Sequence, residues 1–255
     1  MKHLKKLVTF AILVTCSFQL QALIQQDLNQ NQPPPVNPNG TPTSTFIIDD
    51  GTAETAIGDG GQFIWLNRFT PAASEFPFQL EEVSTVFAGT LVSVGDTIRI
   101  LVYEDTDGDG DPGTGAVLLA DITETIQFND QLTFNVYDLP TPVRLDGPGD
   151  VLIGIVNSYG SEGFNDFPAA LDTTASNGRS WAATYLAGDV PANPALPGDE
   201  QWGTIDSFGL PGNWIVRGAG THIALPIPAL NYIGLIVFMF MIIGLFIFRN
   251  KDTVN

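Results

Sequence analysis

Short runs in which apolar and polar residues alternate fill the chain between residues 46 and 223. Because successive side chains of a β-strand point to opposite faces, this two-residue period predicts strands with one buried face. The runs are rich in β-branched and aromatic residues and span 62–69, 78–87, 97–104, 116–126, 132–139, 150–159 and 213–218. Turn-forming stretches such as DGDGDPGTG and LDGPGD separate them, and no stretch of useful length has the period of a helix. We therefore expect eight to ten strands in an all-β domain, an antiparallel β-sandwich of the jelly-roll type.

Residues 1–22 have a different pattern, which is typical of a secretory signal peptide. Three lysines precede an apolar run over residues 7–18, and Ala22 supplies a small residue at a cleavage point. Two alternatives stay open. Cys16, at the end of LVTC, is a candidate lipidation site, and the segment could remain as an uncleaved anchor.

A stretch rich in Gln, Asn, Pro and Thr follows the signal peptide. It reads QQDLNQNQPPPVNPNGTPTST over residues 25–45 and has little to bury. We therefore expect residues 23–45 to form a flexible or polyproline-like spacer. The β-domain then occupies residues 46–223, and residues 224–255 form a separate C-terminal segment.

The C-terminal segment contains a long apolar run. Between residues 229 and 248 the one clearly polar residue is Asn231, and about 20 such residues can cross a hydrocarbon core. Arg249 and Lys251 follow directly, which favours a cytoplasmic end. A buried core helix is the alternative, but the run lacks the polar face that such a helix usually has. The pattern predicts a single transmembrane helix with the β-domain outside the membrane.

The residues at the start of this segment resemble the IPTL-CTERM sorting signal of Gram-negative bacteria, which is similar to PEP-CTERM tails. The resemblance is carried by Ile227, Pro228, Leu230, Gly234 and Arg249. The usual motif has Thr, Ser and Trp where this chain has Ala229, Asn231 and Ile233. The resemblance implies export across the inner membrane, an exosortase-like processing peptidase as a partner, and a membrane-anchored or surface location. Proline would keep the chain extended ahead of the helix, where a peptidase can bind it.

The charge of the chain is strongly negative, with a formal net charge of −18. Between residues 23 and 248 the sequence has five arginines against 27 acidic residues. Such a surface repels phosphate backbones, so we exclude nucleic acid as a partner. Cation binding and simple solubility both fit this composition. The single cysteine lies in the signal peptide, so the domain has no thiol or disulfide.

A short acidic stretch is the strongest candidate for a metal site. Its carboxylates recur at every second residue, at Asp105, Asp107, Asp109 and Asp111, with Gly108 and Gly110 between the last three. Ca²⁺ takes six to eight oxygen ligands in a flexible arrangement, and this spacing turns several carboxylates toward one centre. The stretch resembles the start of the D-x-D-x-D-G loop of EF-hands and thrombospondin-type repeats. It departs at Ala116, where an EF-hand has a bidentate Glu, so a β-hairpin loop with Ca²⁺ is expected rather than an EF-hand. The alternative is a solvated acidic turn.

The residues needed for most enzyme chemistry are missing from the domain. The two histidines are His3, in the signal peptide, and His222, near the C-terminal segment. This placement excludes a Ser-His-Asp triad and a His-bearing zinc site inside the domain. The sequence also has no phosphate-binding loop. A pair of carboxylates could still hydrolyse a glycoside, but no pair stands out. We expect a protein that is not an enzyme.

Four tryptophans and an isolated arginine are the remaining candidates for ligand binding. Trp65 and Trp214 lie in strand patterns and are expected in the core. Trp181 and Trp202 flank a long Pro- and Gly-rich loop and are candidates for stacking on a ligand, with packing as the alternative. Arg179, in SNGRSW, is expected to pair with an acid, and a ligand clamp is the alternative.

Together these patterns predict an exported cell-surface protein. It displays a β-sandwich with a binding or structural role, like that of an adhesin or matrix protein, and contacts a cell-envelope or matrix component such as a glycan. A carbohydrate-binding module and a carboxylate-based glycoside hydrolase are the alternatives. The blocks VYEDTDGDGDPGTGA and WGTIDSFGLPGNWIVRG also resemble a domain found in secreted bacterial proteins of unknown role, a resemblance that implies no activity.

Overall fold

The computed structural model describes residues 23–28, 44–89, 91–158, 166–223 and 240–242. The expected signal peptide, most of the expected spacer and the sorting motif from Ile227 to Arg249 lie outside the described residues. Within the described ranges, no helix is long and apolar enough to cross a membrane. The expected transmembrane helix over residues 229–248 falls almost entirely outside those ranges.

The described part of the chain is all-β, as the alternating pattern predicts. Its strands pair antiparallel throughout, and two 3-10 turns, η1 (Ala73–Glu75) and η2 (Ile205–Phe208), are the only helical turns described within the domain. The strands are β1 (Ile24–Asp27), β2 (Ser44–Phe46), β3 (Thr55–Gly58), β4 (Phe63–Phe69), β5 (Phe78–Thr85), β6 (Thr97–Asp105), β7 (Ala116–Thr125), β8 (Asn135–Leu145), β9 (Asp150–Asn157), β10 (Ala169–Asp172), β11 (Ser180–Thr184), β12 (Gln201–Thr204), β13 (Asn213–Trp214) and β14 (Val216–His222). Strand β1 lies within the stretch expected to be a spacer, so that stretch is not free of regular structure.

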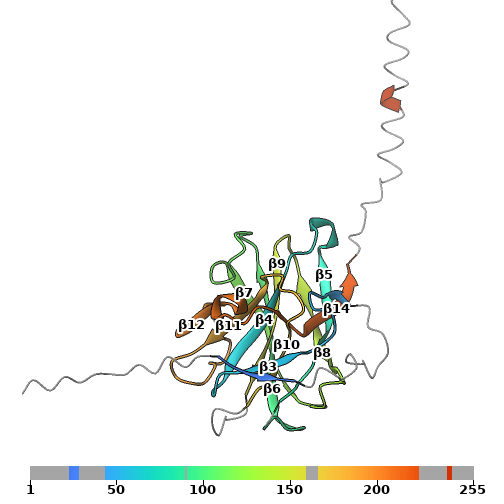
Figure 1. Cartoon of the computed structure of the whole chain (residues 1–255). Helices are drawn as coiled ribbons and strands as arrows, with labels where there is room; N and C mark the ends of the chain where they lie inside the picture. The colour runs from blue at the N-terminus through green and yellow to red at the C-terminus, as the bar shows by residue number, and fades with distance from the viewer. Residues whose placement is uncertain (1–22, 29–43, 90, 159–165, 224–239, 243–255) are drawn as a thin grey trace, which may run out of the picture.

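Three sheets form two layers around the main core. The large sheet has the order β12-β11-β4-β9-β6-β7, and it faces the sheets β2-β14-β5-β8 and β1-β3-β10-β13 (Figure 1). The main core lies between them, where Trp65, Ile100 and Ile153 of the large sheet pack with Leu80 and Val216 of the opposite layer. Layers that pack face to face in this way form a β-sandwich.

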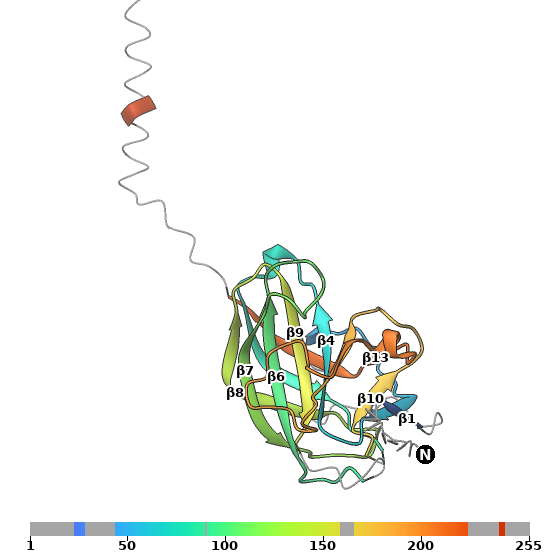
Figure 2. The same ribbon diagram turned by 90° about the vertical axis from the view of Figure 1, so that its left-hand side faces the viewer.

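The two smaller sheets are joined along the chain. Strands β13 and β14 are separated only by Ile215, and an isolated bridge pairs Phe87 with Ala169. In Figure 2, β1, β10 and β13 lie to one side of the tall sheet that contains β4, β6 and β9. Trp65 and Trp214 are fully buried, so the expectation that both belong to the core is confirmed.

The outer face of the large sheet carries a second, smaller core. It contains Ile64, Leu101, Tyr103 and Leu152, and the loop over residues 185–200 covers it. The hydroxyl of Tyr103 donates to the carbonyl of Pro194 at 3.0 Å and so fastens the loop to the sheet. The acidic hairpin loop between β6 and β7 lies at the end of the same sheet.

Candidate functional site

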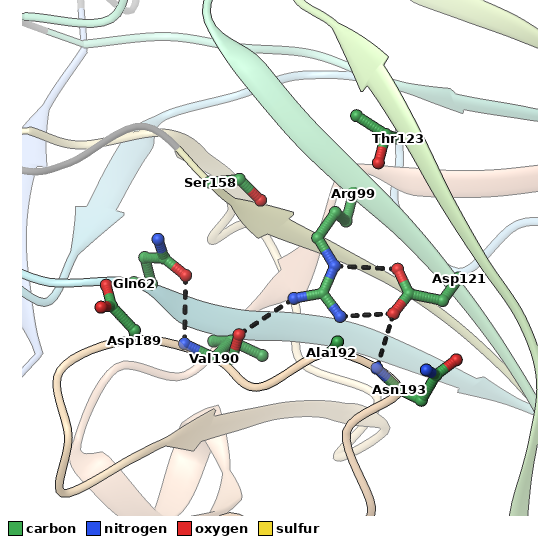
Figure 3. Close-up of a pocket in the computed structure, with 9 residues that line it drawn as sticks. All are labelled: Gln62, Arg99, Asp121, Thr123, Ser158, Asp189, Val190, Ala192 and Asn193. Carbon is green, nitrogen blue, oxygen red and sulfur yellow. Dashed lines mark hydrogen bonds and ion pairs between the residues drawn. The ribbon is translucent and has the colours of Figure 1, made fainter.

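A polar cavity of about 580 Å³ lies where the loop over residues 185–200 meets strands β6 and β7 (Figure 3). Arg99 occupies its floor. The guanidinium donates from Nε to Oδ1 of Asp121 at 2.8 Å, from another nitrogen to the carbonyl of Val190 at 3.0 Å, and to the carbonyl of Pro191 at 2.8 Å. A second close contact joins Arg99 to Oδ2 of Asp121. The pair therefore anchors the loop.

The carboxyl group of Asp121 is committed to this anchor and is unsuited to acid or base chemistry. Burial alone would raise its pKa. The hydrogen bonds from Arg99 and from the backbone N–H of Asn193 lower the pKa of Asp121 below its ordinary value instead. Asp121 is therefore not poised to donate a proton, and the expectation that the protein is not an enzyme stays a prediction.

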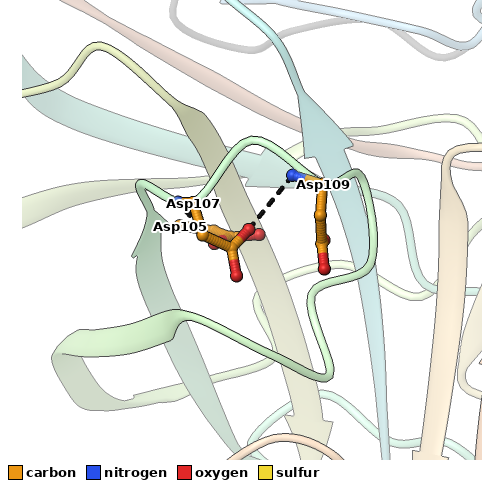
Figure 4. A group of neighbouring side chains, drawn as sticks. All are labelled: Asp105, Asp107 and Asp109. Carbon is orange, nitrogen blue, oxygen red and sulfur yellow. Dashed lines mark hydrogen bonds between the residues drawn. The ribbon is translucent and has the colours of Figure 1, made fainter.

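The acidic loop between β6 and β7 brings three of the predicted ligands together. Asp105, Asp107 and Asp109 each place a carboxylate oxygen within 4.8 Å of the others (Figure 4). Asp105 is the last residue of β6 and is fully buried, whereas Asp107 and Asp109 are exposed in the loop. The cluster is thus open to solvent on one side and closed by the sheet on the other.

Hydrogen bonds to the loop's own backbone fix these carboxylates. The backbone N–H of Asp109 donates to Oδ1 of Asp107 at 3.1 Å, and that of Asp111 donates to Oδ1 of Asp109 at 2.7 Å. The hydroxyl of Thr114 donates to Oδ2 of Asp109 at 2.8 Å and to Oδ2 of Asp107 at 3.3 Å. Such Asx turns explain why the spacing of two residues turns the carboxylates to the same side.

One glycine leaves room for the cluster. Gly115 has a φ of +75°, and a Cβ built there would lie 2.5 Å from Oδ2 of Asp107 and 2.6 Å from Oδ1 of Asp105. Any other residue would be strained in this conformation and would push into both carboxylates. The space beside the carboxylates therefore depends on glycine at this position.

The electrostatics of the cluster differ between its buried and exposed members. The pKa of Asp105 is raised to about 6, chiefly by burial and then by repulsion from nearby carboxylates, against a backbone hydrogen bond from Asp107. Its Oδ2 is buried and has no hydrogen-bond partner in the described part of the chain. By contrast, the backbone N–H of Asp111 lowers the pKa of Asp109. A buried oxygen without a partner is costly unless something else binds it.

The fourth predicted ligand, Asp111, points elsewhere. Its Oδ1 accepts hydrogen bonds from the backbone N–H of Gly113 at 2.9 Å and from Nε1 of Trp202 at 3.3 Å. Trp202 stacks on Trp181 with ring centroids 4.9 Å apart and an interplanar angle of 27°. Both indoles are partly buried against the outer core. Their contacts show packing, and a role in ligand stacking stays a prediction.

Two residues beneath the loop were not anticipated from the sequence. Arg68 donates to Oδ2 of Asp150 at 2.7 Å, and a Cβ at Gly110 would lie 3.2 Å from the same guanidinium. The loop therefore packs over an ion pair that spans β4 and β9. No local pattern marks this pair, since the two residues are 82 positions apart and meet only when the strands align.

The expected ion pair at Arg179 is not found. Arg68, Arg99, Arg144 and Arg217 each pair with an aspartate, at Asp150, Asp121, Asp146 and Asp49 respectively. In the ranges that the structure describes, Arg179 has no such partner. The pair that was expected at Arg179 is therefore not confirmed among the described residues.

Comparison with known proteins assigns no family. No family model and no curated protein matches the chain. The cysteine protease and lectin-like domains of Cwp84, a surface layer associated protein of Clostridium difficile, are 14% identical in an alignment that covers 69% of this chain, with a TM-score of 0.46. The clostridial cysteine protease Cwp84 after propeptide cleavage is 14% identical over 62% of this chain, with a TM-score of 0.40. This chain spans 35% of the length of each, and the assignments below rest on its own residues.

Proposed function

We propose that the protein is an exported cell-surface module, a β-sandwich of the jelly-roll type, that binds Ca²⁺ in its acidic loop and has a binding or structural role. One observation carries the Ca²⁺ assignment. Three carboxylates converge within 4.8 Å, and one of them has a buried oxygen with no hydrogen-bond partner among the described residues. The acidic surface supports a cation as ligand and argues against polyanionic partners.

The donor set fits a hard cation better than a soft one. Asp105, Asp107 and Asp109 supply only oxygens, and neither cysteine nor histidine lies in the loop. Ca²⁺ accepts carboxylate, carbonyl and water oxygens in an irregular shell, so a loop with three carboxylates and an open side suits it. Bound Ca²⁺ would neutralise the mutual repulsion of these side chains and supply a partner for the buried oxygen of Asp105.

The ion's role follows from where the loop lies. The loop joins β6 to the edge strand β7, covers the Arg68–Asp150 ion pair and contacts Trp202. Fixing this loop would stiffen the free end of the large sheet, which benefits a domain exposed outside the cell. Ca²⁺ is then a structural ligand of a surface module.

The Ca²⁺ assignment is tested by thermal unfolding with and without the ion. Ca²⁺ at about 100 times its Kd stabilises by about 2.7 kcal/mol, which raises the Tm of a domain of this size by roughly 5–10 °C. Chelator should reverse the rise. The double variant Asp107→Asn, Asp109→Asn should lose it, because it removes two of the three charges.

A matched control removes two exposed carboxylates outside the loop. The variant Asp146→Asn, Asp189→Asn changes the net charge equally and should keep the full Ca²⁺ response. If the parent protein shows no change in Tm with Ca²⁺, the assignment is wrong. If the control variant loses the response as well, the effect comes from the overall charge and the loop is not the site.

Delivery to the cell surface is part of the same proposal. The resemblance of Ile227, Pro228, Leu230, Gly234 and Arg249 to a sorting signal supports it, together with the signal-like pattern of residues 1–22. An exosortase-like peptidase would then process the C-terminal segment. The partner of the displayed domain would be a component of the envelope or matrix of a Gram-negative cell.

A further inference from the structure

Arg179 forms no salt bridge with any acid among the described residues of this strongly acidic protein. It immediately precedes β11 and is partly buried. Its backbone carbonyl accepts a hydrogen bond from the N–H of Arg68 at 2.8 Å, which fixes the main chain at this point. Across the described residues, the other four arginines of the domain are each paired with an aspartate, and this one is not. A partly buried arginine side chain without a salt bridge can be stabilised by a ligand that supplies a carboxylate.

The side chain lines a small pocket with apolar walls. The pocket has a volume of about 200 Å³, and Phe46, Ile48, Phe69 and Pro71 contribute to its lining. Phe46 and Phe69 belong to the main core and lie with their ring centroids 5.3 Å apart. These walls are packed into the core and offer an apolar surface in the same pocket as Arg179.

The remaining polar groups of the pocket have partners of their own. Oε2 of Glu75 accepts a hydrogen bond from the backbone N–H of Ala72 at 2.6 Å. The hydroxyl of Thr70 donates to Oδ1 of Asp150. Neither residue forms an ion pair with Arg179, although both line the same pocket. In the described residues, the guanidinium of Arg179 is therefore free of a salt bridge and can bind a ligand that enters the pocket.

We propose that this pocket binds the carboxylate of a small monoanionic ligand that carries an apolar group. A guanidinium presents its N–H groups as a planar fork that matches a carboxylate, and the apolar walls fit a hydrocarbon or aromatic group attached to it. The size of the pocket suits one such group. The net charge of −18 would repel a polyanion, which excludes a highly charged polymer as the ligand.

This site is independent of the proposed Ca²⁺ loop. None of Asp105, Asp107 and Asp109 lines the pocket. Carboxylate binding should therefore survive the double variant Asp107→Asn, Asp109→Asn and the addition of chelator. Failure of one proposal leaves the other standing.

The test is a titration of the full chain with benzoate and with benzamide, followed by amide chemical shifts and calorimetry. Benzoate should bind and shift the amide resonances of residues 46–48, 69–70 and 179, whereas benzamide should bind at least about tenfold more weakly because it lacks the charge. N-acetyl-leucine and its amide form a second pair, which distinguishes a peptide terminus from a free aromatic acid. Preference for the acid in either pair supports the proposal.

Two arginine variants test whether the acid binds at Arg179. Arg179→Gln should weaken acid binding by about 10- to 100-fold, whereas Arg144→Gln, which removes an exposed arginine paired with Asp146, should leave it unchanged. An unchanged Tm without Ca²⁺ and an unchanged near-UV circular dichroism spectrum would show that Arg179→Gln still folds. If it does not fold, the acid–amide comparison on the parent protein decides alone. Equal binding of acids and amides, no binding of either acid, or an equal loss in Arg144→Gln would overturn the proposal.

Discussion

A carboxyl group buried just after strand β3 makes the fold sensitive to pH. Asp59 is 3% exposed, and its Oδ1 has no hydrogen-bond partner in the part of the chain that the structure describes. Burial, with repulsion from Glu200, raises the pKa of Asp59 to about 7. In the unfolded chain the same group titrates near 4. The folded state therefore binds more protons than the unfolded state between about pH 4 and pH 7.

Stability should fall as the pH rises through this window. As the pH rises, the free energy of unfolding decreases wherever the native state binds more protons than the unfolded state. The loss of stability is therefore complete above about pH 7. Asp59→Asn removes the buried charge and should be more stable than the parent by roughly 2 kcal/mol at pH 8, with no gain at pH 4. Urea unfolding at both pH values measures the difference.

A partial variant checks the cause. Glu200→Gln removes the repulsion, keeps a side-chain oxygen that can accept the hydrogen bond from Thr184, and should give a smaller gain at pH 8. Equal stability of parent and Asp59→Asn at pH 8 would show that the Asp59 carboxylate is not penalised in the folded protein.

Some of the site could be predicted at the scale of single residues, and some could not. The alternation of Asp105, Asp107 and Asp109 follows from the sequence, because an Asx turn is local chemistry. The burial of Asp105 does not, since it comes from the pairing of β6 with β9, where Asp105 lies opposite Asp150. Whether Arg179 forms a salt bridge depends on the positions of all the acidic residues in the fold, which no local sequence pattern predicts.

At the scale of elements, a single buried amide joins the two layers of the sandwich. Nδ2 of Asn67, on β4, donates to the carbonyls of Trp214 at 2.8 Å and Val216 at 2.9 Å, and its Oδ1 accepts from the hydroxyl of Ser180 at 2.7 Å. These bonds hold the junction between β13 and β14, where the smaller sheets meet. Without the Asn67 side chain, each of these three groups would lose a hydrogen bond inside the core.

Asn67→Leu should therefore be strongly destabilising. The two carbonyls lose their side-chain donor inside the core, which should cost roughly 2–4 kcal/mol by chemical denaturation. The matched control is Asn177→Leu, since Asn177 is exposed and its side chain donates only to the carbonyl of Ile48 at 2.7 Å. The control should cost under about 1 kcal/mol, and comparable losses for both variants would show that the interlayer bonds carry no special weight.

The strand pattern predicted the long elements well and the short ones poorly. Each of the seven expected runs contains a strand, but β3, β10, β11 and β12 have only four or five residues, too few to show a period. The expected strand over residues 132–139 ends just before Pro140, and Pro142 follows two residues later. The structure continues it as β8, since β8 is the edge of its sheet and its pairing with β5 is irregular between Leu80 and Glu82. Proline is tolerated at such places because it need not donate to a neighbouring strand.

At the scale of the whole molecule, the negative charge bears on how the protein would be held at a membrane. The chain has a formal net charge of −18, and such an acidic surface is repelled by anionic lipid headgroups. An apolar segment such as residues 229–248 would hold it near a membrane despite that repulsion. The two properties suit a protein that is first retained at a membrane and then released to the cell surface.

Release predicts a specific C-terminus. If the segment that begins at Ile227 is a sorting signal, a peptidase should cut where proline keeps the chain extended, so the mature protein should end between residues 226 and 232. Intact mass and sequencing of the C-terminal peptide, from membrane and culture-medium fractions of the native host, measure this directly. A chain in the medium that ends between these residues supports a C-terminal sorting signal that is removed by cleavage. A chain that ends at Asn255 and is confined to membranes identifies a permanent anchor and rules out sorting, while the Ca²⁺ and carboxylate sites, which lie wholly within the β-domain, would keep their separate tests.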